Sequence, residues 1–391
     1  MKKKICIFCS LSSFNTGMPI STYKLASGLV KSGRYDVCAV LPGEGELAER
    51  LRMESVDVRI IRFRRLRAMG VFSALFFLVS WLVAGLRFRS FVRKRGVDIV
   101  HFSDVIDAPF YPWARLAGAK VVAHVRASLG GPAVKLFFRL WTRIFCWKLI
   151  TVSDFVRRSY RLRRRAAVVY NPGPDRKIFD PNAFPRKTSV AKGARVPEPA
   201  VIMVASFRRD KGHHNFLKIA SKIMERVDGK ARFVIVGGEV KGHEDYYGEM
   251  MELAWDLGVK GNLTVTGNIP HENVPLVMST ASVLLHAPDW DEALGGVILE
   301  AMAMNVAVVA YNCGGVGECF TDGKSGYLIK RGDLDGAADK IASLLKSPEL
   351  MAEMAGRARA ELDVRFAMDR YIGGVERVYG YKPEEGVSGN G

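Results

Sequence analysis

Residues 291–303 read DEALGGVILEAMA and follow, after three residues, an apolar run at residues 281–287. The apolar run predicts a buried strand, and the residues from Val297 to Met304 predict a short buried helix. Gly295 and Gly296 break the chain between the two. A strand, a glycine turn and a helix N-terminus together form an anion site, because free N–H groups and the helix dipole point at whatever lies over the glycines.

Two carboxylates frame this turn, Glu292 before it and Glu300 about one helical turn inside the helix. A carboxylate beside a phosphate would repel it, so both side chains are expected to accept hydrogen bonds from hydroxyl groups. A nucleotide sugar carries a diphosphate as well as sugar hydroxyls, and it therefore fits both demands of the stretch.

The chain has 391 residues, 49% of them apolar, which is long for one core, so two globular domains are expected. Its six cysteines form no disulfide-like pattern and favour a reducing, cytosolic compartment. The lysine-rich N-terminus leads into a predicted strand rather than into the apolar core of a signal peptide.

The net charge of +18 is distributed unevenly along the chain. Residues 1–190 contain 35 Lys and Arg against 12 Asp and Glu, whereas residues 191–391 contain 23 against 28. The basic first half predicts an anionic partner, either a membrane surface or a nucleic acid.

Short apolar runs alternate with helical patterns in both halves of the chain. The predicted strands are 5–9, 37–41, 56–62, 99–102, 121–125, 149–152 and 168–170 in the first half, and 201–205, 233–236, 263–266, 283–286 and 306–311 in the second. This alternation predicts an α/β fold with two doubly wound, Rossmann-like parallel sheets. Ligands of such sheets bind beyond the carboxyl ends of the strands, here in a cleft between the domains.

A segment with several Pro, Gly and Lys residues separates the two halves. The predicted organisation is an N-terminal domain at residues 1–182, a linker at 183–199 and a C-terminal domain at 200–366. A final helix at 367–381 is expected to cross back to the first domain and precedes a polar, Gly-rich tail at 382–391, which is expected to be disordered.

Residues 68–86 contain no charged side chain, and arginines flank them on both sides. The length permits a transmembrane span, but strands of one predicted sheet precede and follow the segment, and a single crossing would separate them. A helix buried on the sheet is the second alternative. We favour a third, a helix partly sunk in the bilayer interface with its arginines on lipid phosphates.

Residues 135–148 predict an amphipathic helix. Lys135, Arg139 and Arg143 recur every four residues on one face, and aliphatic and aromatic residues occupy the opposite face. This pattern is typical of membrane surfaces, and nucleic-acid binding is the alternative. Because no nucleic-acid-binding motif accompanies the helix, we favour an anionic membrane surface and expect no nucleic-acid partner.

These motifs resemble those of the retaining glycosyltransferases of family 4, which have the GT-B fold of two Rossmann-like domains, and the resemblance covers nearly the whole chain. Glu292 and Glu300 match the E-x7-E signature of that family. The resemblance implies that Glu300 binds the ribose hydroxyls and that Glu292 contacts the donor sugar. It also implies that the backbone amides of Leu294, Gly295 and Gly296 meet the sugar and the diphosphate.

The sequence FRRDKGH at residues 207–213 resembles the diphosphate-binding R…KG turn of the family. Lys211 matches the lysine of this turn. Ser206 occupies the usual arginine position, so the resemblance assigns the second cation to Arg208 or Arg209.

Further matches occur on both sides of these motifs. Residues 314–318 and 322–328 are similar to the GG-x-x-E and DG-x-x-G segments of the family, residues 170–175 to its interdomain turn, and residues 98–101 to its D-V-V-H strand. Asn305 replaces a glycine after the signature helix, and the turn can survive because asparagine tolerates the left-handed conformation.

The resemblance also implies two site residues in the first half. Gly17 matches one of two glycines that approach the phosphate, and the strand that bears the active-site histidine contains His124. The usual register would put Arg126 at the histidine position, but Arg126 and His124 share one face of the strand, and His124 is the predicted catalytic residue.

A sugar that leaves a nucleoside diphosphate develops negative charge on the diphosphate, and Lys211, an adjacent arginine and the helix N-terminus are expected to stabilise that charge. The resemblance implies retention without a metal ion or another cofactor. Asp289 and Asp291 spell a D-x-D motif, but that motif belongs to metal-dependent enzymes of another fold.

The sequence thus predicts a hexosyltransferase-type enzyme on the cytosolic face of the cell membrane. It would move a sugar from a nucleoside-diphosphate sugar to a membrane-associated acceptor, such as a lipid-linked saccharide in envelope polysaccharide synthesis. The alternatives are a transferase with a soluble acceptor and a degenerate membrane scaffold without catalysis. The presence of Glu292, Glu300 and Lys211 argues against the scaffold.

Overall fold

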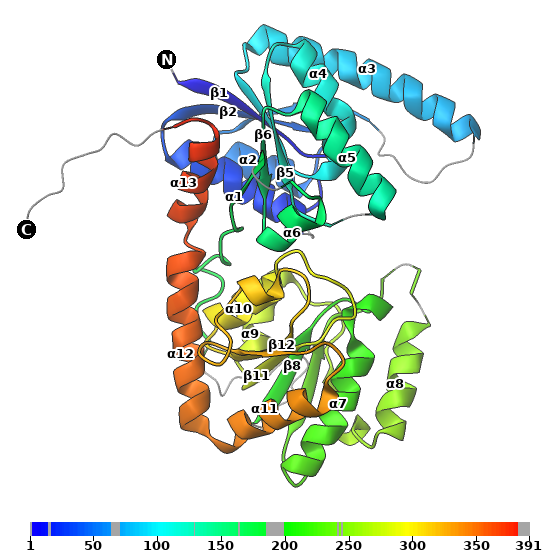
Figure 1. Cartoon of the computed structure of the whole chain (residues 1–391), viewed down its shortest axis with the longest axis vertical. Coiled ribbons are helices and arrows are strands. Elements are labelled where there is room, and N and C mark those ends of the chain that lie inside the picture. The colour runs from blue at the N-terminus through cyan, green and yellow to red at the C-terminus, as the bar shows by residue number, and fades with distance from the viewer. Residues whose placement is uncertain are drawn as a thin grey trace, which may run out of the picture. The chain divides into compact units, whose positions relative to one another are not determined.

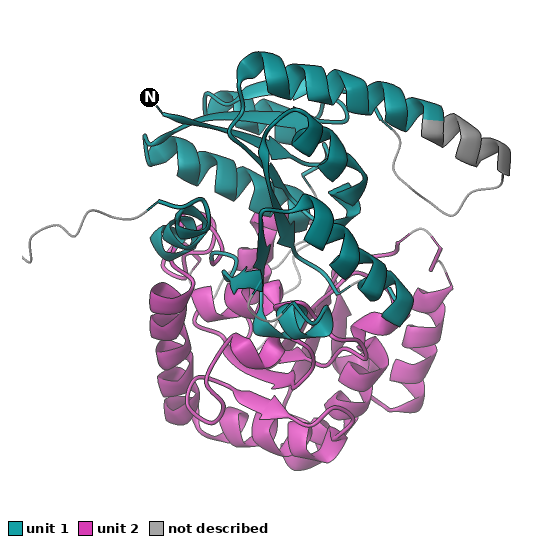
Figure 2. Ribbon diagram, turned by 45° about the horizontal axis from the view of Figure 1, so that its top comes forward, with its two compact units in different colours: residues 1–172, 368–391 teal, residues 173–367 magenta. Residues whose placement is uncertain are grey.

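The computed structural model describes residues 2–14, 17–63, 71–128, 130–162, 165–184, 199–240, 242–243 and 245–381, and for residues 71–78 it describes the backbone alone. Contacts within the chain divide it into two compact units, which Figure 2 shows in different colours. Unit 1 comprises residues 1–172 and 368–391, and unit 2 comprises residues 173–367.

Unit 1 is built on a seven-stranded parallel sheet in the order β3-β2-β1-β4-β5-β6-β7 (Figure 1). Its strands are β1 (Lys3–Phe8), β2 (Tyr35–Leu41), β3 (Asp57–Ile60), β4 (Ile99–Phe102), β5 (Lys120–Val125), β6 (Lys148–Thr151) and β7 (Ala166–Val168). The chain runs outward from β1 to β3 and then returns to β4, on the other side of β1. The carboxyl ends of β1 and β4 are therefore the switch point at which doubly wound sheets bind ligands.

Helices cover both faces of this sheet. They are α1 (Gly17–Lys31), α2 (Glu46–Met53), α3 (Val71–Arg95), η1 (Val105–Phe110), α4 (Tyr111–Leu116), α5 (Pro132–Phe145), α6 (Asp154–Ser159) and α13 (Met368–Val378). Ile5 and Ile7 are buried with residues of α1, α2 and α13, whereas Phe8 contacts Phe88 of α3 and Phe110 of η1 on the opposite face. Strands that are buried on both faces need continuous apolar runs, and such runs are the signal that made the strands predictable.

Helix α13 completes the core of unit 1. Tyr371, Val375 and Tyr379 are buried against residues of the N-terminal sheet. The carboxylate of Glu376 is buried as well, and the Arg34 guanidinium donates two hydrogen bonds to it, at 2.9 and 2.7 Å. Such a bidentate pair offsets the desolvation of a buried carboxylate, so the end of the chain is fixed to unit 1 by packing and by charge.

Unit 2 contains a six-stranded parallel sheet in the order β10-β9-β8-β11-β12-β13. Its strands are β8 (Ala200–Val204), β9 (Arg232–Val236), β10 (Leu263–Val265), β11 (Val283–His286), β12 (Ala307–Tyr311) and β13 (Tyr327–Ile329). Its helices are η4 (Arg209–Lys211), α7 (His213–Arg226), α8 (Tyr246–Asp256), η5 (Lys260–Asn262), η6 (His271–Asn273), α9 (Val274–Met278), α10 (Gly296–Ala303), η7 (Val316–Glu318), α11 (Leu334–Lys346) and α12 (Pro348–Arg365). The switch point of this sheet lies between β8 and β11.

Both sheets are parallel and doubly wound, as the sequence predicted. Two strands differ from the prediction in more than one or two residues at an end. β13 is missing from the predicted strands, because its three residues follow a polar turn and form too short a run to show a period. β7 ends at Val168, where the predicted strand begins, although the N–H of Val169 still donates to the Thr151 carbonyl at 2.9 Å.

The structure divides the chain between Pro172 and Gly173, whereas the sequence analysis places the boundary after residue 182. The segment between them packs within unit 2, since the N–H of Gly173 donates to the Phe366 carbonyl at 2.8 Å and Phe179 is fully buried. Most of the predicted linker, residues 185–198, and the predicted disordered tail, residues 382–391, lie outside the described residues.

The predicted apolar helix corresponds to α3, and residues 68–70 of that prediction lie outside the described residues. No helix in the described part of the chain is long and apolar enough to cross a bilayer. After residue 78, α3 buries Ala84, Phe88 and Val92 in unit 1. Its free face exposes Val79, Leu82, Val83 and Leu86. One side of the helix therefore packs on the sheet, while the other keeps apolar side chains at the surface.

Candidate active site

The turn between β11 and α10 has the geometry that its sequence predicts. Gly295 is the N-cap of α10, with a φ of 68°, and no side chain caps the helix. Leu294 is buried beneath the turn, and its carbonyl lies 3.7 Å from the Cys319 Sγ. The N–H groups of the first turn, which begins at Gly296, and the positive end of the helix dipole thus provide a position for an anion.

A second glycine turn holds the backbone of Glu292 in place. The N–H of Gly315 donates to the Glu292 carbonyl at 2.8 Å. Gly314 has a φ of 62°, and a Cβ there would lie 2.1 Å from the same carbonyl oxygen. Only glycine allows this close approach, which explains the first glycine of the Gly-Gly pair after β12.

Lys211 and Glu292 form an ion pair across two loops of unit 2. The Lys211 Nζ lies 2.7 Å from the Glu292 Oε1, and the side chains are 23% and 20% exposed. The turn that carries Lys211 is pressed against the end of β11, because a Cβ on Gly212, whose φ is 79°, would lie 2.0 Å from the Ala287 carbonyl. The pair thus places a cation and an acceptor next to each other, where a ligand can reach both.

The two arginines predicted beside Lys211 have other partners. Arg208 donates to both carboxylate oxygens of Asp210, at 3.0 and 2.6 Å. Arg209 forms a bidentate pair with Glu249 of α8 and lies over the Tyr246 ring. In the described structure, Lys211 therefore pairs with a glutamate of the E-x7-E signature, whereas Arg208 and Arg209 pair with other carboxylates.

Glu300 projects from α10 and contacts a histidine that the sequence analysis did not include. The His271 Nε2 lies 3.0 Å from the Glu300 Oε1, and the His271 ring packs against Phe179. Both Glu300 and His271 are partly exposed, so the carboxylate remains available to hydroxyl groups. No pattern in the sequence distinguishes His271, because its loop comes near α10 only in the folded sheet.

The D-x-D carboxylates both have protein partners. Asp289 accepts a hydrogen bond from the Asn215 Nδ2 at 2.8 Å and lies 3.1 Å from the His214 Nε2. Asp291 pairs with Arg331. In the described residues, no group of three or more His, Cys, Asp or Glu side chains comes together in a way that could hold a metal ion.

His286 is another residue that the sequence analysis did not assign to the site. It is the last residue of β11, and its Nε2 is buried without a hydrogen-bond partner in the described structure. Burial lowers the pKa of His286 to about 4, although the Glu292 charge raises it by more than the Lys211 charge lowers it. The imidazole is therefore neutral at physiological pH and lies in the electrostatic field of the Lys211–Glu292 pair.

In unit 1, His124 belongs to a buried network. Its Nδ1 lies 3.2 Å from the His101 Nε2 and 3.1 Å from the Arg126 Nη2. The hydroxyl of Tyr379 lies 2.7 Å from the His101 Nδ1, and Arg126 also donates to the Tyr371 hydroxyl at 3.3 Å. Arg126, directly after β5, and His124 thus lie side by side, as expected, and their partners include His101 of β4 and Tyr371 of α13.

The chemistry of Arg126 assigns the protons of this network. A guanidinium only donates, so the His124 Nδ1 accepts and the His124 proton lies on Nε2, which has no partner in the described structure. Burial, and next the Arg126 charge, lowers the pKa of His101 to about 3 and holds that of His124 well below its ordinary value. His124 is fully buried, its recorded contacts within unit 1 are to His101 and Arg126, and its catalytic role stays a prediction.

The switch point of unit 1 carries two buried carboxyl groups that the sequence analysis missed. Asp104 and Asp107 follow β4, and the N–H of Asp104 donates to the Asp107 Oδ2 at 3.1 Å. Burial raises the pKa of Asp104 to about 6 and that of Asp107 to about 7.

Gly17, the predicted phosphate-contacting glycine, is the exposed first residue of α1, and a Cβ there would meet no atom within 4 Å.

The predicted site residues therefore fall into two groups. Glu292, Glu300, Lys211 and the Leu294–Gly296 turn gather at the carboxyl edge of the sheet in unit 2, while Gly17 and His124 belong to unit 1. In unit 1 the structure does not bring these two residues into a recorded contact with each other.

The relatives found among known proteins include enzymes that transfer or attach sugars. The chain is 27% identical over 313 residues to the GDP-mannose-dependent alpha-(1-6)-phosphatidylinositol monomannoside mannosyltransferase of Mycobacterium tuberculosis, with 73% of this chain and 76% of that protein covered. It is 29% identical over 187 residues to the N-acetyl-alpha-D-glucosaminyl L-malate synthase of Bacillus anthracis, a match that spans 48% of this chain and 46% of that protein.

The fold has close counterparts among solved structures. Anabaena Alr3699/HepE, in complex with UDP and glucose, superimposes with a TM-score of 0.78 at 17% identity, with 97% of this chain and 99% of that chain covered. Residues 15–172 match the model of Glycosyltransferase Family 4, and residues 186–361 match that of Glycosyl transferases group 1. The chain is thus a glycosyltransferase of the group 1 and family 4 type, with the GT-B fold.

Proposed function

We propose that the protein transfers a sugar, with retention of its anomeric configuration, from a nucleoside-diphosphate sugar to an acceptor at a membrane surface. The observation that carries the donor part is the arrangement of the Lys211–Glu292 pair, the uncapped start of α10 and Glu300 at one edge of the unit 2 sheet. A diphosphate needs a cation and free N–H groups, and the attached sugars need acceptors for their hydroxyl groups.

Each side chain has a defined part in this proposal. Lys211 and the N-terminus of α10 stabilise the negative charge that develops on the leaving diphosphate. Glu292 accepts a hydrogen bond from a hydroxyl of the transferred sugar, and Glu300 accepts from the ribose. The acceptor hydroxyl attacks the anomeric carbon, the bond to the diphosphate breaks, and the hydroxyl proton leaves with the diphosphate or with water.

Two named relatives support a nucleotide donor. The mycobacterial mannosyltransferase is GDP-mannose-dependent, and the Anabaena protein was solved with UDP and glucose. We propose that Lys211 contacts the diphosphate that both nucleotides share. Contacts with the base would then decide between them.

The acceptor part of the proposal rests on the surface of α5. The side chains of Leu136, Phe137, Leu140 and Ile144 are 48 to 66% exposed, although they are large and apolar. They lie beside the basic row of Lys135, Arg139 and Arg143 on the same helix. Apolar side chains next to cations fit the boundary between acyl chains and lipid phosphates. The acceptor named for the mycobacterial relative is a phosphatidylinositol monomannoside.

A screen of nucleotide sugars tests the donor part. Wild type and Glu292→Gln are incubated with UDP- and GDP-linked hexoses, and release of the nucleoside diphosphate is measured. We expect release with at least one donor and a loss of roughly a hundredfold or more in the variant. Equal rates in the two proteins would contradict the role of Glu292.

Flotation with vesicles tests the membrane part. Wild type is expected to float with phosphatidylglycerol vesicles, and a Phe137→Ser/Ile144→Ser variant is expected to stay in the soluble fraction. Met53→Ser/Val364→Ser replaces two apolar side chains on α2 and α12 that are at least as exposed, and it serves as the control. If wild type does not float, the membrane part is wrong and the acceptor is a soluble molecule. The name of the Bacillus anthracis relative contains such a molecule, L-malate.

A further inference from the structure

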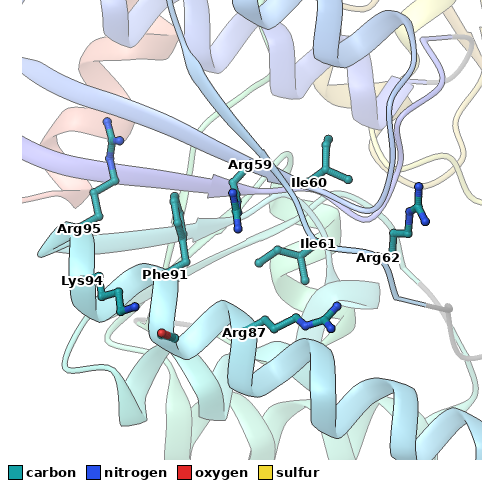
Figure 3. A pocket seen from close by; sticks show the side chains of 9 residues that line it. Arg59, Ile60, Ile61, Arg62, Arg87, Phe91, Lys94 and Arg95 are labelled. Carbon is teal, nitrogen blue, oxygen red and sulfur yellow. The ribbon is translucent and has the colours of Figure 1, made fainter.

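Unit 1 has a cavity of about 720 Å³ between its edge strand β3 and helix α3. Arg59 and Ile60 of β3, together with Ile61 and Arg62 just after it, form one wall. The opposite wall comes from α3, and Figure 3 shows the two sets of side chains on either side of the space. The lining residues on α3 are Arg87, Ser90, Phe91, Lys94 and Arg95. This cavity lies at the outer edge of the sheet, away from the β1–β4 switch point.

The charge of the lining is of one sign. Five lining residues are Arg or Lys, and none is Asp or Glu. No ion pair is recorded in the described part of the chain for four of these cations, Arg59, Arg62, Arg87 and Lys94. Surface cations usually lie near carboxylates that offset their charge, so an uncompensated group around a concave space favours an anionic ligand.

Arg95 closes one end of the cavity and is already held in place. Its guanidinium lies 3.0 Å from the Asp36 carboxylate and also pairs with Asp57. Its Nε is buried and has no hydrogen-bond partner in the described structure. The two aspartates fix the orientation of Arg95, so this end of the cavity is held without further loss of side-chain freedom when a ligand binds.

The face of α3 that lines the cavity continues into an apolar surface. Residues four apart share a helix face, so Val79 and Val83 precede Arg87 on one row, and Leu86 precedes Ser90 on the next. Val79, Val83 and Leu86 are 41 to 55% exposed. Along a single helix the surface therefore changes from apolar to basic, which matches the change from acyl chains to phosphates at a bilayer interface.

We propose that this cavity binds the phosphate-bearing headgroup of an anionic membrane lipid. Arg59, Arg87 and Lys94 contact the phosphate, and the apolar wall of Ile61 and Phe91 faces the glycerol carbons. The inference rests on the membrane attachment in the proposed function and adds to it a defined lipid site, separate from the sugar-donor site in unit 2. Bound lipid would hold α3 in a fixed position on the membrane.

The test compares two variants of α3 with the same loss of charge. Arg87→Gln/Lys94→Gln removes two cations from the cavity, and Arg89→Gln/Arg93→Gln removes two from α3 outside it. Partition onto phosphatidylcholine vesicles with and without phosphatidylglycerol is measured for the full chain. We expect the cavity variant to bind the anionic vesicles roughly thirtyfold more weakly than wild type, and the control to lose clearly less. Nucleoside-diphosphate binding and the melting temperature, measured in parallel, should remain those of wild type.

Any other result of the vesicle experiment contradicts a specific part of the proposal. If both variants lose affinity equally, the attraction is diffuse and the cavity is no lipid site, although the membrane attachment stands. If wild type does not bind vesicles at all, both the proposed membrane attachment and the proposed lipid site are wrong. The sugar-donor site in unit 2 is then tested by nucleotide binding alone. If glycerol phosphate or inorganic phosphate binds wild type as tightly as the vesicles do, the cavity takes a free phosphate instead of a lipid.

Discussion

Both units gather polar side chains near the carboxyl ends of their parallel strands, but with opposite exposure. In unit 2 the Lys211–Glu292 pair is about one-fifth exposed. In unit 1 the His101–His124–Arg126 network is buried, and its partners come from the same unit, including the returning helix α13. A site whose charges remain open to solvent is suited to a charged ligand, whereas a network buried among elements of its own unit mainly holds those elements together. The comparison predicts that substitutions in unit 2 change activity and that those in unit 1 change stability.

The largest effect is expected for Lys211→Met. The variant keeps the methylene stem but loses the cation that meets the diphosphate, so we expect kcat to fall by roughly a hundredfold to a thousandfold. The melting temperature should change little, because the pair is partly exposed. Steady-state kinetics and thermal unfolding measure the two quantities. Lys222→Met removes a lysine that pairs with Asp335 at 2.9 Å on the surface of the same unit and serves as the control. A kcat that drops equally in both variants would assign no special role to Lys211.

The reverse pattern is expected for Arg126→Met. The substitution leaves the Ser103 carbonyl, which now accepts from the Arg126 Nε at 2.9 Å, buried without that donor, and it also removes the contact with Asn171. We expect the free energy of unfolding of unit 1 to fall by about 3 kcal/mol, since hydrogen bonds to a charged group are lost in a buried place. Urea unfolding followed by tryptophan fluorescence measures this loss, with the exposed Arg115→Met as control. A fully stable variant with no activity would show that Arg126 acts on substrate instead.

The free energy of unfolding of unit 1 is also expected to depend on pH through His101. In the unfolded chain His101 takes up a proton near its ordinary pKa of 6.5, whereas burial lowers its folded pKa to about 3. Between these values the unfolded state binds more protons, so the free energy of unfolding falls as the pH decreases from 6.5 towards 3. The raised pKa values of Asp104 and Asp107 act in the opposite direction but are common to the proteins compared.

We therefore expect His101→Asn to lose part of this acid sensitivity. The midpoint of urea unfolding, measured between pH 7 and pH 4 for wild type and variant, should decline less steeply in the variant. The groups that face His101 are His124, Arg126 and Tyr379, and all three remain. Identical slopes in the two proteins would mean that His101 is protonated in the folded state.

The smallest effect is expected for Arg209→Gln. Its exposed pair with Glu249 is of the kind that contributes little to stability, so the melting temperature should stay within experimental error. The resemblance allowed either arginine as the second diphosphate cation. A marked rise in KM for the donor in Arg209→Gln, and not in Arg208→Gln, would assign that role to Arg209 and would mean that the Glu249 pair opens on binding.

The comparison also explains what the sequence could predict. The E-x7-E stretch and the glycine turn are local, so strand, turn and helix could be placed around Glu292 and Glu300 before the structure. The partner of Glu292 was found through a second local motif, although Lys211 is 81 residues away. The parallel strands were predictable for the same reason, because the signal of each strand is a run of consecutive apolar residues.

The residues that were missed depend on strand order instead. The contact between His101 and Tyr379 joins residues 278 apart, and it forms only because α13 returns to the sheet of unit 1. His271 and His286 are single histidines whose surroundings come from other loops. Asp104 and Asp107 become significant only once β4 is known to lie beside β1. None of these positions has a periodic or spaced signal that a sequence can display.

The central claim is that Glu300, one helical turn inside α10, holds the nucleotide part of the donor. Calorimetric titration of wild type and Glu300→Ala with UDP and with GDP tests it most directly, with the exposed α12 residue Glu353→Ala as the matched control. We expect wild type and the control to bind at least one of the two nucleotides equally well. We expect Glu300→Ala to bind it at least tenfold more weakly, because the hydrogen bonds from ribose to a charged acceptor are lost. Equal affinity of Glu300→Ala and wild type would contradict the assignment of the donor site.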